Sequence, residues 1–281
     1  MNTTATLKAI ACQVRRDILR MVHAVQSGHP GGSLGCTELM VALYFDVLNH
    51  NPAEFEMNGR DQDVFLLSNG HLSAVWYSVL ARSGYFEISE LSTFRKIDTR
   101  LQGHPATHDG LPGVRFASGS LGQGLSCAIG VALAKKLDQD DSLVYVLMGD
   151  GEIQEGQVWE AAMFAGGKKV DNLIAIIDFN RKQIDGPTDE VMPMGDIKAK
   201  WEAFDWEVLE MDGNDIEEVI DTLRLAGTLT GNEKPVMILM KTEMGQGVDF
   251  MMGTHKWHGV APNDEQLEKA LAQLEETLGD Y

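Results

Sequence analysis

The spacing of apolar residues along the chain predicts several amphipathic helices. The first lies near the N-terminus, and Gly28 is expected to end it. A second helix is predicted over residues 37–48, with Thr37 as its cap. Further helical patterns cover about 121–137 and 216–227. The apolar positions that define the first helix are Leu7, Ile10, Val14, Ile18, Met21 and Val25.

Short, continuous apolar runs separate these helical patterns and predict buried strands. They lie at residues 64–67, 143–148, 172–178 and 235–242. Continuous apolar strands that alternate with helices are typical of a parallel sheet that is covered on both faces. The pattern therefore predicts an α/β fold with a mostly parallel sheet and helices on both faces. Because no repeat, linker or low-complexity tract interrupts it, we expect a single domain over residues 1–281.

The last predicted helix lies near the C-terminus. Asn263 and Gln266 stand at its start in the pattern of a capping box. The positions that form its apolar stripe are Leu267, Leu271, Leu274 and Leu278.

Composition narrows the class of protein. The chain has 281 residues and a net charge of -19, which argues against a nucleic-acid partner because phosphate backbones bind basic surfaces. Its three cysteines are scattered and lack metal-ligand spacing, which fits a reducing compartment. No signal peptide is evident, and no apolar run reaches the roughly 18 residues that a membrane span needs. We therefore expect a cytoplasmic protein with no membrane contact.

Acidic side chains gather in the turn after the strand at 143–148. The stretch "GDGEIQEGQVWE" carries Asp150 and Glu152 among its carboxylates, and such close charges repel one another unless a cation or a proton lies among them. Asn180 follows the next strand along the chain, and the carboxyl ends of neighbouring parallel strands form a ligand-binding crevice. Carboxylate and amide oxygens suit Mg²⁺ or Ca²⁺, with a phosphorylated ligand completing the coordination. The alternative is an ordinary surface turn, because Asp-Gly is a favoured turn dipeptide.

Six stretches of the chain together resemble the N-terminal half of transketolase. They follow that family's order from residue 27 to residue 259. The resemblance implies the thiamine diphosphate-binding fold, with thiamine diphosphate and a divalent metal, Mg²⁺ or Ca²⁺, as cofactors. The stretches are "SGHPGGSLG" (27–35), "LSNGH" (67–71), "QGHP" (102–105), "SGSLGQG" (118–124), "GDGEIQEGQVWEA" (149–161) and "THKWHG" (254–259).

The resemblance also implies which residues hold the cofactor. Asp150 and Asn180 match the family's side-chain metal ligands. Lys182 would bind the metal through its backbone carbonyl, at a position where the family usually has a small or apolar residue. Gly151 would lie against the diphosphate. The cofactor-binding loop would comprise Gly119, Ser120 and Leu121, where the family often has Gly-Pro-Leu.

Several histidines fall within the matched stretches. Cleavage of a ketose between C2 and C3 needs a base for the C3 hydroxyl proton and donors for the neighbouring oxygens, and imidazole can serve in either role. By resemblance, His29 and His258 handle substrate hydroxyl protons, with His258 also near the cofactor. His104 holds the C1 hydroxyl, and His71 touches the diphosphate. A histidine beside a glycine can equally be a structural hydrogen-bonding group. We expect His255 to support the site and His23, His50 and His108 to be structural, with His23 and His50 on helix faces.

Two further acidic residues follow the metal-binding turn. In the resembling family, acidic residues after this turn link two active sites at the subunit contact, which would be the role of Glu155 and Glu160. The alternative is a solvated acidic helix start, which the helix dipole favours.

The resemblance covers only the diphosphate-binding half of a transketolase. In the family, the glutamate that activates the cofactor, and the residues that hold the sugar phosphate, belong to the pyrimidine-binding domain. We therefore expect a separately encoded C-terminal partner subunit, with two copies of each chain in a heterotetramer. The expected activity moves a two-carbon ketol unit from a ketose phosphate such as xylulose 5-phosphate to an aldose phosphate such as ribose 5-phosphate.

Other functions remain open from the sequence. The chain could belong to a deoxyxylulose-phosphate synthase, to a 2-oxo acid dehydrogenase, or to a transketolase for an unusual sugar. It could also be a non-catalytic module that binds thiamine diphosphate. A dinucleotide-binding fold is disfavoured because no G-x-G-x-x-G follows a strand.

Overall fold

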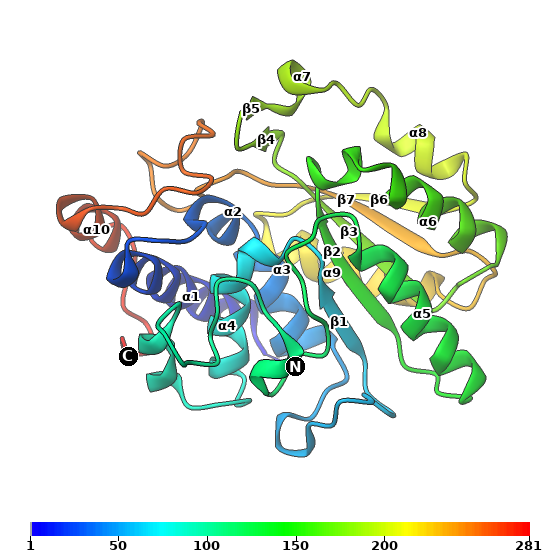
Figure 1. The fold of residues 1–281 in the computed structure, drawn as a ribbon, viewed down its shortest axis with the longest axis horizontal. Helices are drawn as coiled ribbons and strands as arrows, with labels where there is room; N and C mark the ends of the chain where they lie inside the picture. The colour runs from blue at the N-terminus through cyan, green and yellow to red at the C-terminus, as the bar shows by residue number, and fades with distance from the viewer. Residues whose placement is uncertain (1) are drawn as a thin grey trace.

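The computed structural model describes residues 2–281, which form a five-stranded sheet between two layers of helices (Figure 1). The sheet order is β1-β2-β3-β7-β6, and every neighbouring pair is parallel. A separate antiparallel pair, β4 (Lys182–Gln183) with β5 (Gly186–Pro187), follows β3. The strands are β1 (Val64–Leu67), β2 (Val144–Gly149), β3 (Leu173–Phe179), β6 (Glu207–Asp212) and β7 (Val236–Lys241).

Helices cover both faces of this sheet. One face packs against α1, α3, α4 and α9, and the other against α5, α6 and α8 (Figure 1). The predicted α/β fold is therefore confirmed. The helices are α1 (Thr4–Val25), α2 (Pro30–Gly35), α3 (Thr37–Ala42), α4 (Ser73–Arg82), α5 (Gly124–Leu137), α6 (Gly156–Gly167), α7 (Thr188–Val191), α8 (Ile197–Glu202), α9 (Ile216–Leu229) and α10 (Asp264–Leu271).

Successive residues of each central strand enter opposite cores. On β2, Tyr145 and Leu147 join the core under α1, α3 and α4, whereas Val144 and Val146 join the core under α5 and α6. This alternation follows from the pleat, which turns neighbouring side chains to opposite faces. Because both faces are covered, both sets of side chains must be apolar, which explains the uninterrupted apolar run.

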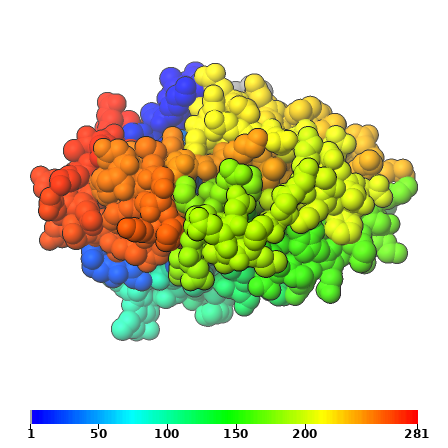
Figure 2. Space-filling view, turned by 90° about the horizontal axis from the view of Figure 1, so that it is seen from above, coloured from blue at the N-terminus to red at the C-terminus, as the bar shows by residue number. Residues whose placement is uncertain are grey.

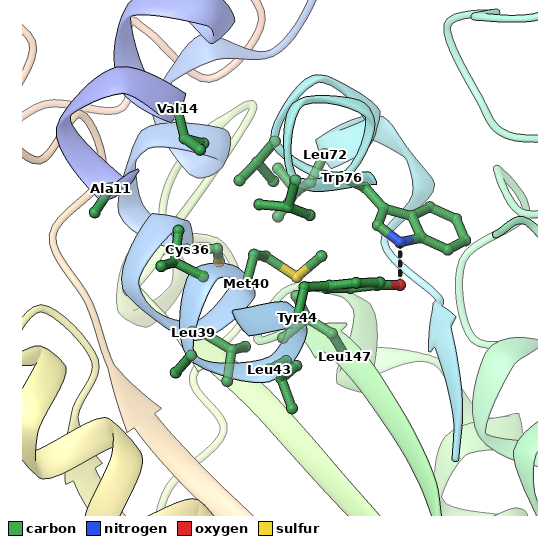
Figure 3. Close-up of a cluster of buried hydrophobic side chains, with 14 of the residues drawn as sticks. Ala11, Val14, Cys36, Leu39, Met40, Leu43, Tyr44, Leu72, Trp76 and Leu147 are labelled. Atoms are coloured by element: carbon green, nitrogen blue, oxygen red, sulfur yellow. Dashed lines mark hydrogen bonds between the residues drawn. The ribbon is translucent and has the colours of Figure 1, made fainter. Parts of the chain in front are cut away.

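The larger core combines aliphatic packing with one buried polar contact. Figure 3 shows Tyr44, just after α3, lying close to Met40, Leu147 and the indole of Trp76 on α4. The indole N–H of Trp76 donates a hydrogen bond of 2.6 Å to the Tyr44 hydroxyl. The pairing satisfies two polar groups that would otherwise be buried without partners.

Two helix boundaries near the N-terminus differ from the prediction. Helix α1 ends at Val25, and Gln26 closes it in the left-handed conformation with φ of 50°. Gly28, predicted as the stop, lies beyond this cap. Its φ of +145° and its close approach to Val22, where a Cβ would meet a methyl carbon at 2.8 Å, explain the glycine instead.

Thr37 is the first residue of α3 and not a helix cap, because Cys36 precedes it and a separate helix, α2, ends at Gly35. The helix predicted over residues 37–48 also changes character, since a π-helical turn (Leu43–Val47) follows α3. Similarly, α5 begins at Gly124 and not near residue 121, because the preceding glycines at 119 and 122 adopt positive φ and interrupt the helix.

The C-terminal helix is shorter than its leucine pattern suggested. The capping box of Asn263 and Gln266 is confirmed, but α10 ends at Leu271. Leu274 is still buried beyond the helix, whereas Leu278 is exposed and does not continue the apolar stripe. None of the helices in residues 2–281 is long and apolar enough to cross a membrane.

We predict that Gly166→Ala destabilises the protein by about 2 kcal/mol, because an added methyl group would overlap a rigid backbone atom. A Cβ on Gly166 would lie 1.8 Å from the carbonyl oxygen of Phe204. Urea unfolding measures the change. Gly167→Ala is the matched control, since a Cβ on this neighbouring residue of α6 meets nothing within 4 Å. Equal stability of the two variants would contradict the packing argument.

Candidate active site

A cavity of 360 Å³ opens at the carboxyl ends of β2 and β3. It gathers segments from distant parts of the chain, including the start of α2, the turn after β1 and the segment after β7. Among the residues predicted from sequence, those that line it are His29, His71, His104, Gly119, Leu121, Asp150, Gly151, Asn180, Lys182 and His258.

Two neighbouring strand ends bring Asp150 and Asn180 together, as predicted. Strands β2 and β3 pair directly, and both residues are buried just beyond their ends. The backbone N–H of Arg181 donates to Asp150 Oδ2 at 2.5 Å. The N–H of Lys182 donates to Asn180 Oδ1 at 2.9 Å. These contacts fix both side chains on the same side of the crevice.

A further carboxylate, which the sequence did not single out, lies beside this pair. Asp178 is buried at the end of β3 and accepts hydrogen bonds from the Asn180 amide, at 2.8 Å, and from the Thr242 hydroxyl. The first contact turns the Asn180 amide so that its nitrogen faces Asp178 and its oxygen points elsewhere. A partner that orients a neighbouring ligand in this way is common around metal ions.

The electrostatics of this corner suit a cation. Burial and the neighbouring charge of Asp178 raise the pKa of Asp150 to about 8. Burial also raises the pKa of Asp178. Among residues 2–281 no group of three His, Cys, Asp or Glu side chains could hold a metal by itself. One carboxylate, one amide and a backbone carbonyl therefore suit a hard divalent cation only if a phosphorylated ligand supplies further oxygens.

Glu152 is a second residue whose role the sequence did not reveal. Its buried carboxylate accepts the N–H of Gly122 at 2.9 Å, the N–H of Gly149 at 3.0 Å and the hydroxyl of Ser68. It thereby joins the loops after β1 and β2 to the loop before α5. No spacing rule connects these three loops, so only the fold could identify this contact.

Three imidazole rings form a cluster at the other side of the cavity. The ring centroid of His29 lies 5.0 Å from that of His71 and 5.6 Å from that of His258. The Nδ1 atoms of His29 and His258 are buried without a hydrogen-bond partner in the described part of the chain. His104 packs against Gly119, whose absent Cβ would lie 3.3 Å from the ring.

All of these imidazoles favour the neutral form. Burial, followed by the charges of His258 and Arg95, lowers the pKa of His29 to about 4. Burial is also the main cause that lowers the pKa of His71, His104 and His258. A neutral ring has one donor and one acceptor nitrogen, so the cluster can hold a polar ligand or accept a proton from it.

The remaining histidines lie outside this cavity. His255 lines an adjoining groove that shares Ile184 and His258 with the cavity. His23 lies on α1 and contacts Asp264. His50 does not lie on a helix face as expected. It follows the π-helical turn, where it stacks on Tyr85 and bonds the Tyr85 hydroxyl at 2.9 Å.

Three other candidates are not brought into the cavity. Ser120 is exposed between two residues that line it. Glu155 is exposed at the start of α6 and makes no side-chain cap contact. Glu160 borders a separate groove between α5 and α6, together with Phe164. Any role of these residues would thus involve contacts beyond this cavity.

Comparison with known proteins gives a consistent result. The model of the family described as "Transketolase, thiamine diphosphate binding domain" matches residues 7–279. One of the two subunits of an apulose-4-phosphate transketolase from Phocaeicola vulgatus is 39% identical, covering 97% of this chain and 95% of that protein. A 6-deoxy-6-sulfo-D-fructose transketolase subunit, SqwG, from a Clostridium species is 40% identical, covering 93% of this chain and 94% of that protein.

A solved transketolase structure shares the fold. The enzyme from Campylobacter jejuni superimposes with a TM-score of 0.89 at 35% sequence identity. The match covers 98% of this chain but only 43% of that enzyme. The chain thus corresponds to less than half the length of this solved relative.

We predict that the folded chain loses stability between pH 7 and pH 5, in part because of His29. The unfolded chain protonates this side chain near its ordinary pKa of 6.5, whereas the folded chain keeps it neutral because its pKa there is about 4. Stability from the neutral ring is complete above pH 6.5 and is lost as the pH falls toward 4. We expect about 1–2 kcal/mol from His29 over this range.

Urea unfolding at several pH values tests this prediction. His29→Gln should lose less stability than the wild type as the pH falls. His108→Gln is the control, because the His108 side chain is 84% exposed. An unchanged pH dependence in His29→Gln would show that His29 does not carry the effect.

Proposed function

Since this chain belongs to the transketolase family and contains its thiamine diphosphate-binding domain, we propose that it is the N-terminal subunit of a two-chain transketolase. The observation that carries the proposal is one of length and of site. The chain matches two relatives named as subunits over almost their whole length, and one cavity gathers the residues of all the family-like stretches. We propose that residues 1–281 form a single diphosphate-binding domain and that the pyrimidine-binding part lies on another chain.

Asp150, Asn180 and the backbone carbonyl of Lys182 would hold the divalent cation. Gly151, His71 and the loop at residues 119–121 would hold the diphosphate. Support comes from the buried carboxylates, which lack a counter-charge, and from the oxygen donors at the strand ends. When bound, thiamine diphosphate supplies the nucleophilic carbon that takes up the ketol unit.

The histidine cluster would manage the protons of the sugar. His29 and His258 would accept and return the proton of the C3 hydroxyl, and His104 would bind the C1 hydroxyl. Their lowered pKa values support these roles, because at neutral pH each ring is free to accept a proton. The burial of the rings also strengthens their hydrogen bonds by excluding water.

We propose two protein contacts for the subunit. Exposed apolar side chains at and near the cavity mouth, among them Leu121 and Ile184, would meet the C-terminal partner subunit. The exposed face of α5 and α6, with Met163 and Phe164, would meet a second copy of this chain and bring in Glu155 and Glu160. Two copies of each chain would give a heterotetramer, which we place in the cytoplasm.

The substrates are sugars with an anionic end. We propose a ketose phosphate such as xylulose 5-phosphate as donor and an aldose phosphate such as ribose 5-phosphate as acceptor. The names of the two relatives favour a second candidate, a branched or sulfonated ketose. The anionic end is common to both, so a panel of phosphorylated and sulfonated ketoses separates them.

Mixing this chain with its partner should produce ketol transfer that neither chain shows alone. A coupled assay with thiamine diphosphate, Mg²⁺ and the ketose panel measures it. Transfer by this chain in isolation would contradict the two-chain proposal. In the pair, His29→Ala should lower kcat about 100-fold or more, as expected for a lost proton acceptor. A module that only binds the cofactor would be unaffected by this substitution.

Asp150→Ala should weaken Mg²⁺-dependent retention of thiamine diphosphate by about 100-fold, because the substitution removes the only proposed carboxylate ligand. Calorimetry on the assembled pair measures the affinity for the cofactor at fixed Mg²⁺. Asp141→Ala is the control, since this residue lies in the exposed loop before β2. Wild-type affinity in Asp150→Ala would rule out the metal site.

A further inference from the structure

One continuous segment joins the end of β7 to His258. In Figure 2 this segment, in orange, lies beside the yellow-green chain that follows β3. The two also share a groove, because Ile184 of one and His258 of the other line it. The loop after β3 carries the proposed metal ligands, and the segment after β7 carries a proposed proton acceptor. Whatever links them sets the distance between the two halves of the site.

Glu243 provides the link. Its Oε1 atom lies 2.9 Å from the ammonium nitrogen of Lys182 and accepts the backbone N–H of Gly253 at 2.8 Å. The backbone N–H of Glu243 in turn donates to Asn214 Oδ1 at 2.7 Å. One carboxylate thus contacts the loop after β3 and the distal part of its own segment.

The ion pair is partly shielded from water. The Lys182 side chain is 17% exposed and that of Glu243 is 38% exposed. Burial opposes ionisation of Glu243, but the contacts with Lys182 and Gly253 outweigh it and lower its pKa. A pair in such a place is less screened than one on the open surface and holds its geometry better.

Lys182 transmits this contact to the proposed metal site. Its side chain bonds Glu243, while its backbone N–H donates to Asn180 Oδ1. Movement of the Lys182 side chain therefore moves the loop that positions Asn180. Glu243 itself does not line the cavity, although the next residue, Met244, does.

The segment after β7 has one other firm attachment. The N–H of Gly31 donates to the carbonyl of Trp257 at 3.1 Å, and the N–H of Gly245 donates to the carbonyl of Gly31 at 2.9 Å. A Cβ on Gly31 would lie 2.6 Å from Met244 Cγ, so the packing there is tight. These bonds fix the segment to the neighbourhood of His29, but only Glu243 joins it by a side chain to the Lys182 loop in the described part of the chain.

We propose that Glu243 is a positioning residue. Through Lys182 it fixes the loop that carries Asn180, and through Gly253 it fixes the segment that carries His258. It thereby sets the spacing between the cation-binding side and the sugar-binding side of the cavity. The meaning of this spacing for catalysis rests on the proposed function, whereas the link itself does not.

Amide hydrogen exchange on the chain itself tests the link. Glu243→Ala should speed exchange about fivefold in both residues 180–187 and residues 250–258, because each loses a hydrogen-bonded contact. Glu243→Gln keeps an acceptor oxygen for Gly253, so exchange should rise only in residues 180–187. Lys182→Met should match Glu243→Gln. Lys241→Met is the control, since it breaks an exposed pair with Glu210, 2.8 Å long, at the end of the same strand.

The assembled pair tests the consequence. Lys182→Met and Glu243→Gln should each weaken Mg²⁺ binding about tenfold with little change in the KM for ketose, and the double variant should be no worse than either. Glu243→Ala should also raise the KM for ketose about tenfold, because the segment with His258 is released. Mg²⁺ affinity is measured by calorimetry at saturating thiamine diphosphate.

The outcomes separate the two proposals. Wild-type exchange rates in Glu243→Ala would overturn the link, whatever the activity. Effects of Lys182→Met and Glu243→Gln that multiply in the double variant would also overturn it, because the residues would then act independently. Absence of ketol transfer in the wild-type pair, together with the expected exchange pattern, would reject the proposed function and leave the link established.

Discussion

The site depends on two carboxylates held side by side where water is nearly excluded. Asp150 and Asp178 lie at the ends of adjoining strands and are buried almost completely. Two like charges at such a place are unfavourable unless one binds a proton or a cation neutralises them. The parallel sheet imposes this proximity, because its register aligns Gly149 with Asp178. The fold thus supplies the affinity for positive charge that the proposed reaction uses.

The opposite side of the cavity follows the reverse principle. Burial there removes charge from the imidazoles of His29, His71 and His258 and leaves them as neutral hydrogen-bonding groups. One cavity therefore combines a region that attracts a cation with a region that stays uncharged. A ligand with a diphosphate at one end and a reacting sugar at the other matches this division.

Much of this arrangement could be predicted from the sequence, and the reasons for the exceptions are physical. Buried parallel strands have a continuous apolar pattern, so the four central ones were identified, and with them the positions of Asp150 and Asn180. Strand β6 was missed because its residues at the sheet edge are largely polar or half-exposed. Glu152, Asp178 and Glu243 were missed because their partners come from loops that are distant in sequence.

The polar character of β6 has a consequence of its own. An outermost strand exposes unpaired N–H and C=O groups to which a strand of another molecule can add. Here Glu207, Glu210 and Asp212 place negative charge along that border, with Glu210 also bonded to Lys198 and Lys241. An incoming strand would have to desolvate these side chains, which disfavours edge-to-edge aggregation. The residues that hid the strand from its pattern are those that keep the sheet from growing.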